Sequence, residues 1–318
     1  MRVLITGSGG FVGSHLTQKL LDEGYEVIAG STVLTEKKSK SNLKKVYLNV
    51  NDKDSIEEVL RKYNPEGIIN LAAQSSVAKS WEIPEETLLV NVLGTLNIIN
   101  SMCKNTPYAK FINIGSSEEY GLTAKNGEYL TEIMPCLPQN PYATSKLSAG
   151  QLALQSAKKH GLNILHVRAF NHFGPGQRLG FVVSDFASQI VNIEKGKSPS
   201  VINVGDLSAQ RDFLYIKDLV NAYTLLLESK KLDLGIVNVC SGVPRKIEDI
   251  LKYMITQSKR EITVNLDSTK LRPSDVPFFV GSNGKIKETV EWESTVEFND
   301  GLELTIEWWR QNLLYEKG

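Results

Sequence analysis

A glycine-rich turn close to the N-terminus constrains the fold more than any other feature of this sequence. The motif Thr-Gly-Ser-Gly-Gly-Phe-Val-Gly joins the apolar run Val3–Thr6 to a stretch with helical spacing, Phe11–Glu23. Gly7, Gly10 and Gly13 keep Cβ atoms out of the turn, so backbone N–H groups and a helix N-terminus can approach a pyrophosphate. We therefore predict a strand–turn–helix unit that binds a dinucleotide, with a tight turn that binds no ligand as the alternative.

Short apolar runs alternate with helical stretches through the first half of the chain. The runs predicted as buried strands are Val3–Thr6, Glu26–Ala29, Val46–Val50, Gly67–Ala72, Lys110–Gly115 and Asn163–Arg168. The stretches predicted as helices are Phe11–Glu23, Lys53–Tyr63, Glu85–Lys104 and Pro141–His160. This alternation is typical of an α/β fold, a Rossmann-type doubly wound parallel sheet with helices on both faces.

The pattern changes after Arg168. We expect an ordered loop at Asn171–Gly180, helices at Phe181–Glu194 and Lys217–Ser229, and strands at Val201–Val204 and Gly235–Cys240. The last of these strands is expected to return to the main sheet. We predict a dinucleotide-binding domain at 1–169 and 211–242. A smaller, discontinuous α/β substrate-binding lobe is predicted at 170–210 and 243–318, with a cleft where the two meet.

A tyrosine and a lysine lie one turn apart on the helix predicted at Pro141–His160. Tyr142 and Lys146 are four residues apart and share a helix face. A cation beside a phenol favours the phenolate, so we expect Lys146 to lower the pKa of Tyr142 below about 10. Such a tyrosine can exchange a proton with a sugar hydroxyl or carbonyl while a nicotinamide exchanges hydride. The alternative is a surface pair without a role.

Polar residues follow the fifth predicted strand, at the edge of a parallel sheet where ligands bind. Ser116 could hydrogen-bond a reacting oxygen there, or it could cap a helix or form a turn. Glu118 is either a second acid or base or part of a solvated edge. No carboxylate follows the second predicted strand, where NAD-binding proteins hold the adenosine ribose. Lys37 and Lys38 could meet a 2′-phosphate or lie in a solvated loop, so NAD and NADP both remain open.

Charge and cysteine content exclude several classes of protein. Lys plus Arg and Asp plus Glu are both 36, which gives no net charge to attract nucleic acid or a membrane surface. No apolar run approaches the length of a membrane span. The three cysteines and four histidines are dispersed, so we expect neither a metal site nor a disulfide framework. A cytoplasmic protein is the expectation.

These motifs together resemble the extended short-chain dehydrogenase/reductases over essentially the whole chain. More narrowly, the sequence is similar to family members that act on GDP-mannose derivatives. The segments that carry the likeness are Asn70–Val77, Ile114–Gly121, Phe170–Gln177, Val204–Phe213 and Leu271–Pro277. Asn49 departs from the family pattern, in which an Asp often lies near the adenine.

The resemblance implies roles for individual residues. Tyr142 would donate the proton, Lys146 would activate it and hold the nicotinamide ribose, and Ser116 would be the active-site hydroxyl, with Glu118 as a further catalytic candidate. The cofactor positions it implies are Gly7, Gly10, Phe11, Val12, Gly13, Val50, Leu71, Ala72, Ala73, Tyr142 and Lys146. The substrate positions it implies are Ser75, Ser76, Ser117, Glu118, Asn171, Val183, Arg211, Arg272 and Asp275.

For the reaction, the resemblance implies NAD(P)H-dependent reduction of the 4-keto group of GDP-4-keto-6-deoxy-mannose to GDP-rhamnose. The alternatives are 4,6-dehydration of GDP-mannose and, further off, another nucleotide-sugar epimerase or dehydratase. A dinucleotide-binding sensor without turnover would lack the tyrosine or the lysine, and both are present. The family also implies a homodimer or a dimer of dimers, for which Glu85–Lys104 and Leu147–Ala157 supply apolar helix positions.

Overall fold

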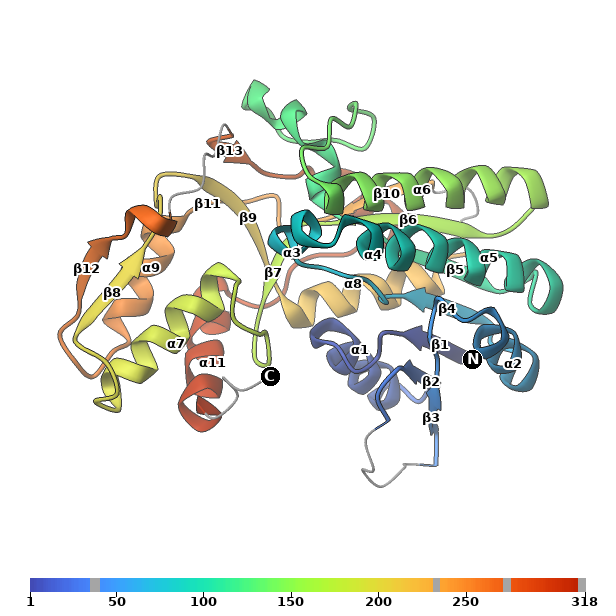
Figure 1. Ribbon diagram of the computed structural model, residues 1–318, viewed down its shortest axis with the longest axis horizontal. Helices are drawn as coiled ribbons and strands as arrows, with labels where there is room; N and C mark the ends of the chain where they lie inside the picture. The colour runs from blue at the N-terminus through green and yellow to red at the C-terminus, as the bar shows by residue number, and fades with distance from the viewer. Residues whose placement is uncertain (35–40, 231–234, 271–275, 314–318) are drawn as a thin grey trace.

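A seven-stranded parallel sheet organises the computed structural model, which describes residues 1–34, 41–230, 235–270 and 276–313 (Figure 1). Its strands are β1 (Arg2–Thr6), β2 (Glu26–Ser31), β3 (Leu43–Tyr47), β4 (Gly67–Asn70), β5 (Lys110–Ile114), β6 (Ile164–Ala169) and β10 (Ile236–Val239). They lie in the order β10-β6-β5-β4-β1-β2-β3, and every neighbouring pair is parallel. The strand order reverses at β1, which creates the switch point where such sheets bind ligands. The predicted α/β fold is confirmed.

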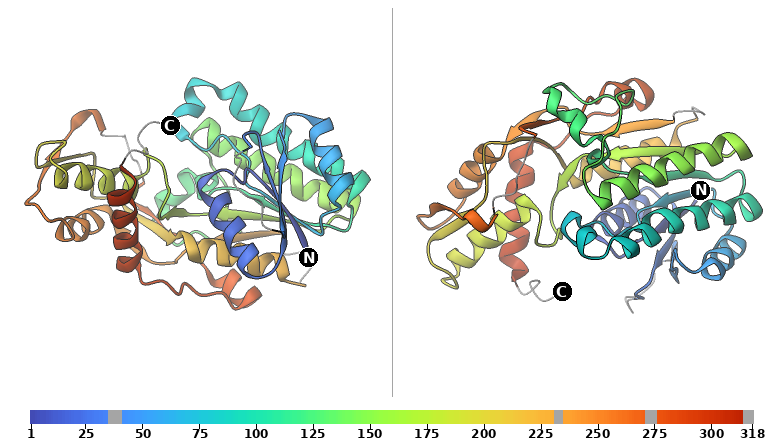
Figure 2. Two further views of the ribbon diagram at one scale, coloured as in Figure 1. Left: turned by 90° about the horizontal axis from the view of Figure 1, so that it is seen from below. Right: turned by 45° about the horizontal axis from the view of Figure 1, so that its top comes forward.

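Helices cover both faces of this sheet. They are α1 (Phe11–Asp22), α2 (Lys53–Tyr63), α3 (Val77–Glu82), α4 (Pro84–Leu88), α5 (Gly94–Asn105), α6 (Pro141–His160) and α8 (Ile216–Glu228). Helices α1 and α8 pack together on one face, and α2, α5 and α6 pack on the other (Figures 1 and 2). Successive strand residues alternate between the two cores: Ile5 and Ile69 belong to one, Leu4 and Ile68 to the other. This explains why these strands are apolar throughout.

Strand β3 differs from the sequence prediction. The predicted strand Val46–Val50 lies several residues beyond the observed one, Leu43–Tyr47. The edge strand is buried only at Leu43 and Val46, so its own apolar signal is weak. Leu48 and Val50 are buried after the strand has ended, in the core beneath α2 and α5. The strand was therefore predicted too late in the sequence, because the buried residues Leu48 and Val50 pack under helices and do not belong to β3.

The predicted helix Glu85–Lys104 is interrupted. It forms α4, a π-helical turn η1 (Leu89–Leu93) and α5. The turn places the amide of Asn91 inward, where it accepts from Gln74 N (2.9 Å) and donates to Ser145 Oγ (2.8 Å). A π-turn of this kind is often found at functional sites. The wider turn is therefore tied to contacts distant in sequence, which periodicity does not reveal.

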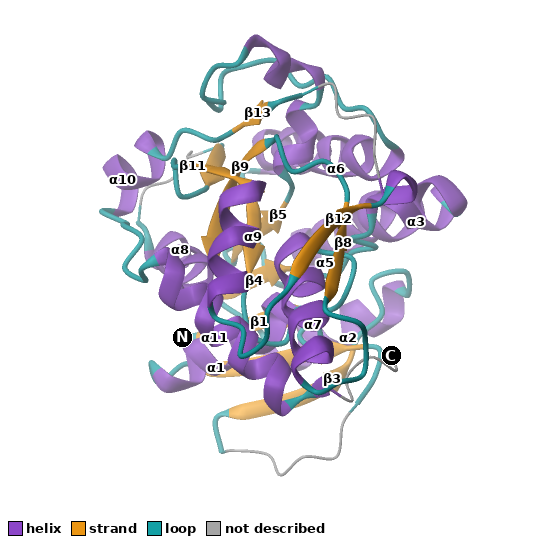
Figure 3. Ribbon diagram, turned by 90° about the vertical axis from the view of Figure 1, so that its left-hand side faces the viewer, coloured by secondary structure: helices purple, strands orange, loops and turns teal. Residues whose placement is uncertain are grey.

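The remaining elements form a smaller lobe and its connections (Figure 3). Its strands are β7 (Asn171–Phe173), β8 (Val201–Val204), β9 (Gln210–Tyr215), β11 (Pro244–Lys246), β12 (Thr263–Leu266) and β13 (Phe278–Phe279). Its helices are α7 (Val182–Glu194), α9 (Ile247–Thr256), α10 (Gly284–Val290) and α11 (Phe298–Gln311). Strand β9 pairs with β11, β13 and β7, while β8 pairs with β12.

The chain passes between the lobe and the main sheet at positions that differ from the predicted boundaries. Strand β9 belongs to the lobe sheet, so the return to the main layers occurs at α8 and not at residue 211. Helix α10 contacts β10 of the main sheet, although its residues were assigned to the lobe. The addition of β10 beside β6 agrees with the predicted return of Gly235–Cys240.

Candidate active site

The carboxyl ends of three central strands bring predicted site residues together. Gly7 follows β1, Ala72 follows β4 and Ser116 follows β5, and these strands are neighbours around the switch point (Figure 1). Thr6 Oγ1 donates to Asn70 Oδ1 (2.6 Å) and accepts from Ala72 N (3.2 Å), which ties the two switch-point loops together. The parallel sheet therefore assembles the site from segments far apart in sequence.

The glycine turn has no room for side chains. Gly7 has a φ of +66°, and a Cβ there would lie 2.8 Å from Ala72 N. A Cβ on Gly13 would lie 2.4 Å from Gly7 O, so α1 begins in close contact with the turn. Gly10 is the N-cap of α1 and gives no side-chain hydrogen bond to its first turn. The backbone donors at this helix start therefore fit the pyrophosphate of a dinucleotide.

A loop from the lobe packs against the start of α1. The ring of Phe11 stacks on His172, with centroids 6.1 Å apart and planes at 8°. His15 Nε2 hydrogen-bonds Pro175 O at 2.8 Å. Burial lowers the pKa of both His15 and His172. Of the predicted cofactor residues, Phe11 thus joins the turn to β7, while His15 joins α1 to the loop that follows β7.

The adenosine end of the predicted cofactor site is less defined. Strand β2 ends at Ser31 and brings no carboxylate to this edge. Val50 is 5% exposed and packs closely against Gly94. A Cβ on Gly94 would lie only 2.7 Å from Val50 Cγ2. Leu71, Ala72 and Ala73 are partly exposed on the loop after β4. Lys37 and Lys38 lie outside the described residues.

Helix α6 carries Tyr142 and Lys146 with the bounds that the sequence predicted, Pro141–His160. Asn140 caps it, because Asn140 Oδ1 accepts from Ala143 N at 2.8 Å. The Lys146 side chain is 7% exposed, and its Nζ donates to Ile114 O at 2.7 Å. This hydrogen bond fixes the lysine to the end of β5, beside the segment that carries Ser116.

The predicted lowering of the Tyr142 pKa below about 10 is wrong. Burial raises the pKa of Tyr142 to about 12, against the lowering effect of a hydrogen bond with Ser116, and the negative charge of Glu118 adds to the rise. Burial also lowers the pKa of Lys146 to about 8, opposed by Glu119. The lysine ammonium donates to a backbone carbonyl, and the desolvation of the phenol outweighs its effect on the Tyr142 pKa.

The segment after β5 places two further candidates beside Tyr142. Ser116 caps a 3-10 helix, η2 (Ser117–Tyr120), and Ser116 Oγ accepts from Glu118 N at 3.2 Å. Glu118 Oε2 accepts from Asn140 Nδ2 at 3.3 Å, which holds this carboxylate at the start of α6. Ser116, Glu118, Tyr142 and Lys146 are thus brought together. Ser117 is 3% exposed, a position that favours packing over the predicted substrate contact.

The lobe contributes a cation on the same side. Arg211, on β9, donates from Nη1 to Gln210 O at 2.9 Å, and its guanidinium lies 6.0 Å from the centre of the Phe279 ring. Burial lowers the pKa of Arg211, and the nearby charge of Glu118 opposes this. Arg211 of the lobe is therefore close enough to Glu118 for the two charges to interact.

Other predicted substrate residues have different environments. Asn171 is exposed at the start of β7. Val183 is 1% exposed within the main hydrophobic core, so its side chain packs and does not line an open surface. Ser76 caps α3, accepting from Lys79 N at 3.2 Å. Arg272 and Asp275 lie outside the described residues.

Sequence reasoning missed two polar contacts near this site. Arg178 Nη2 donates to Ser75 Oγ at 3.2 Å and so joins the loop after β7 to the loop after β4. Asn91 anchors Ser145, the neighbour of Lys146, from within the π-helical turn. Neither residue belongs to a motif with characteristic spacing, so only the fold reveals them.

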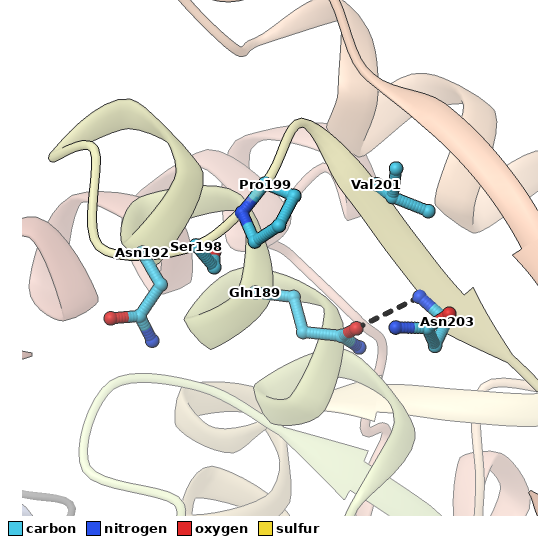
Figure 4. Close-up of a pocket in the computed structure, with 6 residues that line it drawn as sticks. All are labelled: Gln189, Asn192, Ser198, Pro199, Val201 and Asn203. Carbon is cyan, nitrogen blue, oxygen red and sulfur yellow. Dashed lines mark hydrogen bonds between the residues drawn. The ribbon is translucent and has the colours of Figure 1, made fainter.

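A separate small pocket of about 220 Å³ lies in the lobe, between α7 and β8 (Figure 4). Its lining residues are Gln189, Asn192, Ser198, Pro199, Val201 and Asn203. Gln189 Oε1 accepts from Asn203 N at 3.0 Å, which closes one side of it. No charged side chain lines it, and it contains none of the predicted site residues. Among the helices of the described residues, none is long and apolar enough to cross a bilayer.

A doubly wound sheet, a glycine turn at its first helix, and a Tyr142–Lys146 pair beside Ser116 together define an extended short-chain dehydrogenase/reductase. Within that class the chain belongs to the GDP-mannose 4,6 dehydratase family, whose sequence profile matches residues 4–305. It is therefore a member of a family of NAD(P)-dependent enzymes that modify nucleotide sugars.

Individual relatives cover the whole chain. The chain is 30% identical to the GDP-6-deoxy-D-mannose reductase of Pseudomonas aeruginosa over 99% of both sequences. The structure resembles that of RMD from Pseudomonas aeruginosa complexed with NADPH, with a TM-score of 0.86 and 29% identity over 98% of this chain and 99% of that one. The Thermus thermophilus UDP-glucose 4-epimerase complex with NAD gives a TM-score of 0.85 and 29% identity over 98% and 100%.

Proposed function

We propose that this protein is an NAD(P)H-dependent nucleotide-sugar reductase that converts the 4-keto group of GDP-4-keto-6-deoxy-mannose to the alcohol of GDP-rhamnose. The observation that carries the proposal is the packing of α6, which carries Tyr142 and the anchored Lys146, against η2, which Ser116 caps. Full-length similarity to a GDP-6-deoxy-D-mannose reductase supports the choice of substrate.

The site residues suit proton delivery to a carbonyl oxygen. With a pKa of about 12, Tyr142 carries its proton at neutral pH and can donate it to the developing alkoxide of the sugar. Ser116 offers a second hydroxyl next to that phenol, which can orient the oxygen. Lys146, protonated below a pKa of about 8, stabilises the phenolate that remains. The bound dinucleotide would supply the hydride.

The residues that would hold the cofactor are those of the glycine turn and its neighbours. Gly7, Gly10 and Gly13 admit the pyrophosphate to the start of α1, and Phe11 covers that start. The loop Leu71–Ala73 would lie along the dinucleotide after β4. NADPH and NAD, each found in a solved relative, are both compatible with a β2 end that has no carboxylate.

A GDP-sugar brings a diphosphate, for which guanidinium groups are suited. Arg211 lies on the lobe strand β9, near the charge of Glu118. Among the residues that the structure describes, it is our candidate for binding the diphosphate. The resemblance assigns similar contacts to Asn171, Arg272 and Asp275. The sugar would then lie between Arg211 and Tyr142.

The test is to incubate purified protein with GDP-4-keto-6-deoxy-mannose and NADPH, then NADH. We expect loss of absorbance at the reduced-nicotinamide band and a product heavier by two hydrogen atoms. Comparing the two coenzymes ranks them. Absence of turnover with both coenzymes, from protein that binds either one, would refute the reductase assignment.

Dehydration of GDP-mannose is a second candidate, and Glu118 favours it. Loss of water requires a second acid or base beside the phenol, and this carboxylate reaches the start of α6 through Asn140. GDP-mannose would then lose water without net coenzyme consumption. Glu118→Gln separates the two reactions: we expect it to leave ketone reduction within about threefold while lowering dehydration by roughly 100-fold or more.

A further inference from the structure

A buried carboxylate next to the proposed catalytic centre has no part in the mechanism above. Glu119 is fully buried, and its two oxygens take up three neighbouring donors. Oε1 accepts from Ser116 N at 2.9 Å and lies 3.0 Å from His166 Nε2, while Oε2 accepts from Arg168 Nε at 3.0 Å. Burial raises the pKa of Glu119, but its contacts with His166, Arg168 and Ser116 outweigh this and lower it.

The backbone makes room for this cluster. A Cβ on Gly115 would lie 2.3 Å from Glu119 Oε1 and 2.5 Å from His166 Cε1. A Cβ on Gly150, in α6, would lie 2.4 Å from His166 Nε2. Two glycines from different elements therefore form the slot that holds the imidazole. Gly115 immediately precedes Ser116, so the slot and the active-site hydroxyl share one piece of backbone.

The cluster is held at both ends. Asn113 Nδ2 donates to His166 Nδ1 at 3.1 Å, which leaves Nε2 as the donor to Glu119. Asn113 in turn accepts from Asn70, which belongs to the switch-point contacts. On the other side the guanidinium of Arg168 lies 4.6 Å from the centre of the Tyr120 ring. Asn113 of β5 and Tyr120 of η2 thus hold His166 and Arg168, the two β6 side chains that orient the carboxylate.

We propose that Glu119 is a positioning residue that orients Ser116 toward Tyr142 by holding the Ser116 backbone N–H. The inference rests on the proposed reductase function and deepens it. A carboxylate accepts at both oxygens, so it can satisfy the N–H of Ser116, the imidazole and the guanidinium together. An amide in its place would present donors to other donors, and the cap of η2 would shift.

Glu119 acts on the proposed proton transfer through Ser116. Ser116 Oγ accepts from Glu118 N while the backbone N–H of Ser116 is held by Glu119, so both ends of the capping box fix the serine. The Ser116 hydroxyl, on the segment that packs against α6 and Tyr142, is therefore placed by the Glu119 side chain, which is not itself one of the proposed catalytic groups. Loss of that placement affects the rate-determining geometry more than substrate binding.

The test is a double-mutant cycle with Ser116→Ala, measured as steady-state reduction of GDP-4-keto-6-deoxy-mannose by NADPH. In the parent background we expect Glu119→Gln to lower kcat by roughly 10- to 100-fold with KM within about threefold. In the Ser116→Ala background the same change should lower kcat by less than about threefold, because the hydroxyl it positions is gone. Equal losses in both backgrounds would overturn the proposal.

A matched control and a second variant keep the result interpretable. Asp218 is another buried carboxylate, 1% exposed, which accepts from Thr295 N at 3.0 Å away from the site. Asp218→Asn should change kcat by the same factor in both backgrounds. Glu119→Asp keeps the negative charge beside Arg168 but withdraws the oxygen from Ser116 N, and it serves if the amide variant does not fold.

A structural readout separates this inference from the proposed function. If the parent protein reduces no nucleotide keto-sugar, the proposed function fails, and crystal structures of the parent and Glu119→Asp proteins decide the inference. Displacement of Ser116 Oγ from the Tyr142 phenol in the variant supports the positioning role. An unchanged distance between Ser116 Oγ and the Tyr142 phenol oxygen overturns it, whichever substrate the enzyme uses.

Discussion

Two buried lysines, Lys110 of β5 and Lys146 of α6, donate to backbone carbonyls near opposite ends of β5 and have different neighbours. Lys146 Nζ donates to Ile114 O at the carboxyl end of β5. Lys110 Nζ, at the first residue of β5, donates to Ser229 O at 2.6 Å. Burial lowers the pKa of each to about 8. Only Lys146 lies beside Tyr142 and Ser116. The role of a buried lysine therefore depends on its neighbours more than on the lowering of its pKa.

Replacing these lysines by methionine tests that distinction. We expect Lys146→Met to lower kcat/KM for ketone reduction by roughly 100-fold or more, because the phenolate left after proton transfer loses its cation. Lys110→Met removes an equally buried ammonium far from the site and should keep activity within about threefold. The measurement is steady-state kinetics alongside thermal unfolding. Equal loss in both folded variants would contradict the assignment.

The pH dependence follows from the same side chains. Lys146 is cationic below its pKa of about 8 and neutral above it, while Tyr142 keeps its proton until about pH 12. We therefore expect kcat/KM for reduction, which reports the free enzyme, to fall as pH rises through about 8. Lys146→Arg stays charged across this range, so its profile should lack that step. A wild-type kcat/KM that stays constant up to about pH 10, about two units above the pKa of Lys146, would show that the charge of Lys146 does not control the reduction.

At the scale of elements, the start of α1 is positioned by the absence of a side chain. A Cβ on Gly13 would meet Gly7 O at 2.4 Å and Ser8 Cα at 2.7 Å, so the helix would have to move away from the turn. We expect Gly13→Ala to weaken NADPH binding by at least about tenfold and to lower the free energy of unfolding by about 1–3 kcal/mol.

Fluorescence titration with NADPH and chemical denaturation measure the two effects. Gly284→Ala is the control, because a Cβ at that helical position has nothing closer than Ser282 Oγ at 3.6 Å. It should leave both quantities nearly unchanged. Normal NADPH affinity in a folded Gly13→Ala protein would show that α1 can recede without cost to the cofactor site.

At the scale of the whole molecule, one helix layer leaves an apolar surface. Trp81 of α3 is 64% exposed, and Leu89 and Leu93, one turn apart in η1, are 44% and 50% exposed. Helix α3 and the turn η1, which carry these residues, both contact α6 in the helix layer on one face of the main sheet. Exposed apolar side chains gathered in one layer are typical of a protein interface, and we propose that this face forms the homodimer or dimer of dimers that the family resemblance implies.

Light scattering after size exclusion tests this proposal. We expect the parent protein to be dimeric or tetrameric, and Leu93→Glu to shift it toward monomer because a charge cannot be buried without a partner. Leu304→Glu changes an exposed leucine, 46% accessible, on α11 of the lobe and should leave the mass unchanged. A monomeric parent, or a Leu93→Glu protein of unchanged mass, would refute an interface on this face.

Local chemistry explains which features could be predicted from the sequence. The turn with Gly7 and Gly13, and the α6 helix between Asn140 and Gly161, depend on neighbours within a few residues. The parallel sheet follows from apolar runs that are buried on both faces. The Tyr142–Lys146 pair follows from helical spacing. These features can therefore be predicted from the sequence alone.

Contacts between distant segments decided the rest. The π-turn at Asn91, the burial of Val183 and the Arg178–Ser75 contact have no local signal, because each depends on a partner brought close by the sheet and the lobe. The direction of the Tyr142 pKa shift belongs to the same group, since desolvation by surrounding atoms outweighs the lysine one turn away.

The sequence by itself thus determined the class of fold, the dinucleotide turn and the identity of the catalytic candidates, because spacing along one segment specifies them. Only the tertiary structure decided how those candidates are held. The Glu119 carboxylate between Ser116, His166 and Arg168 exists because neighbouring strands place groups far apart in sequence within hydrogen-bonding distance. Proton affinity and orientation are properties of that enclosure, and neither can be read from residue order.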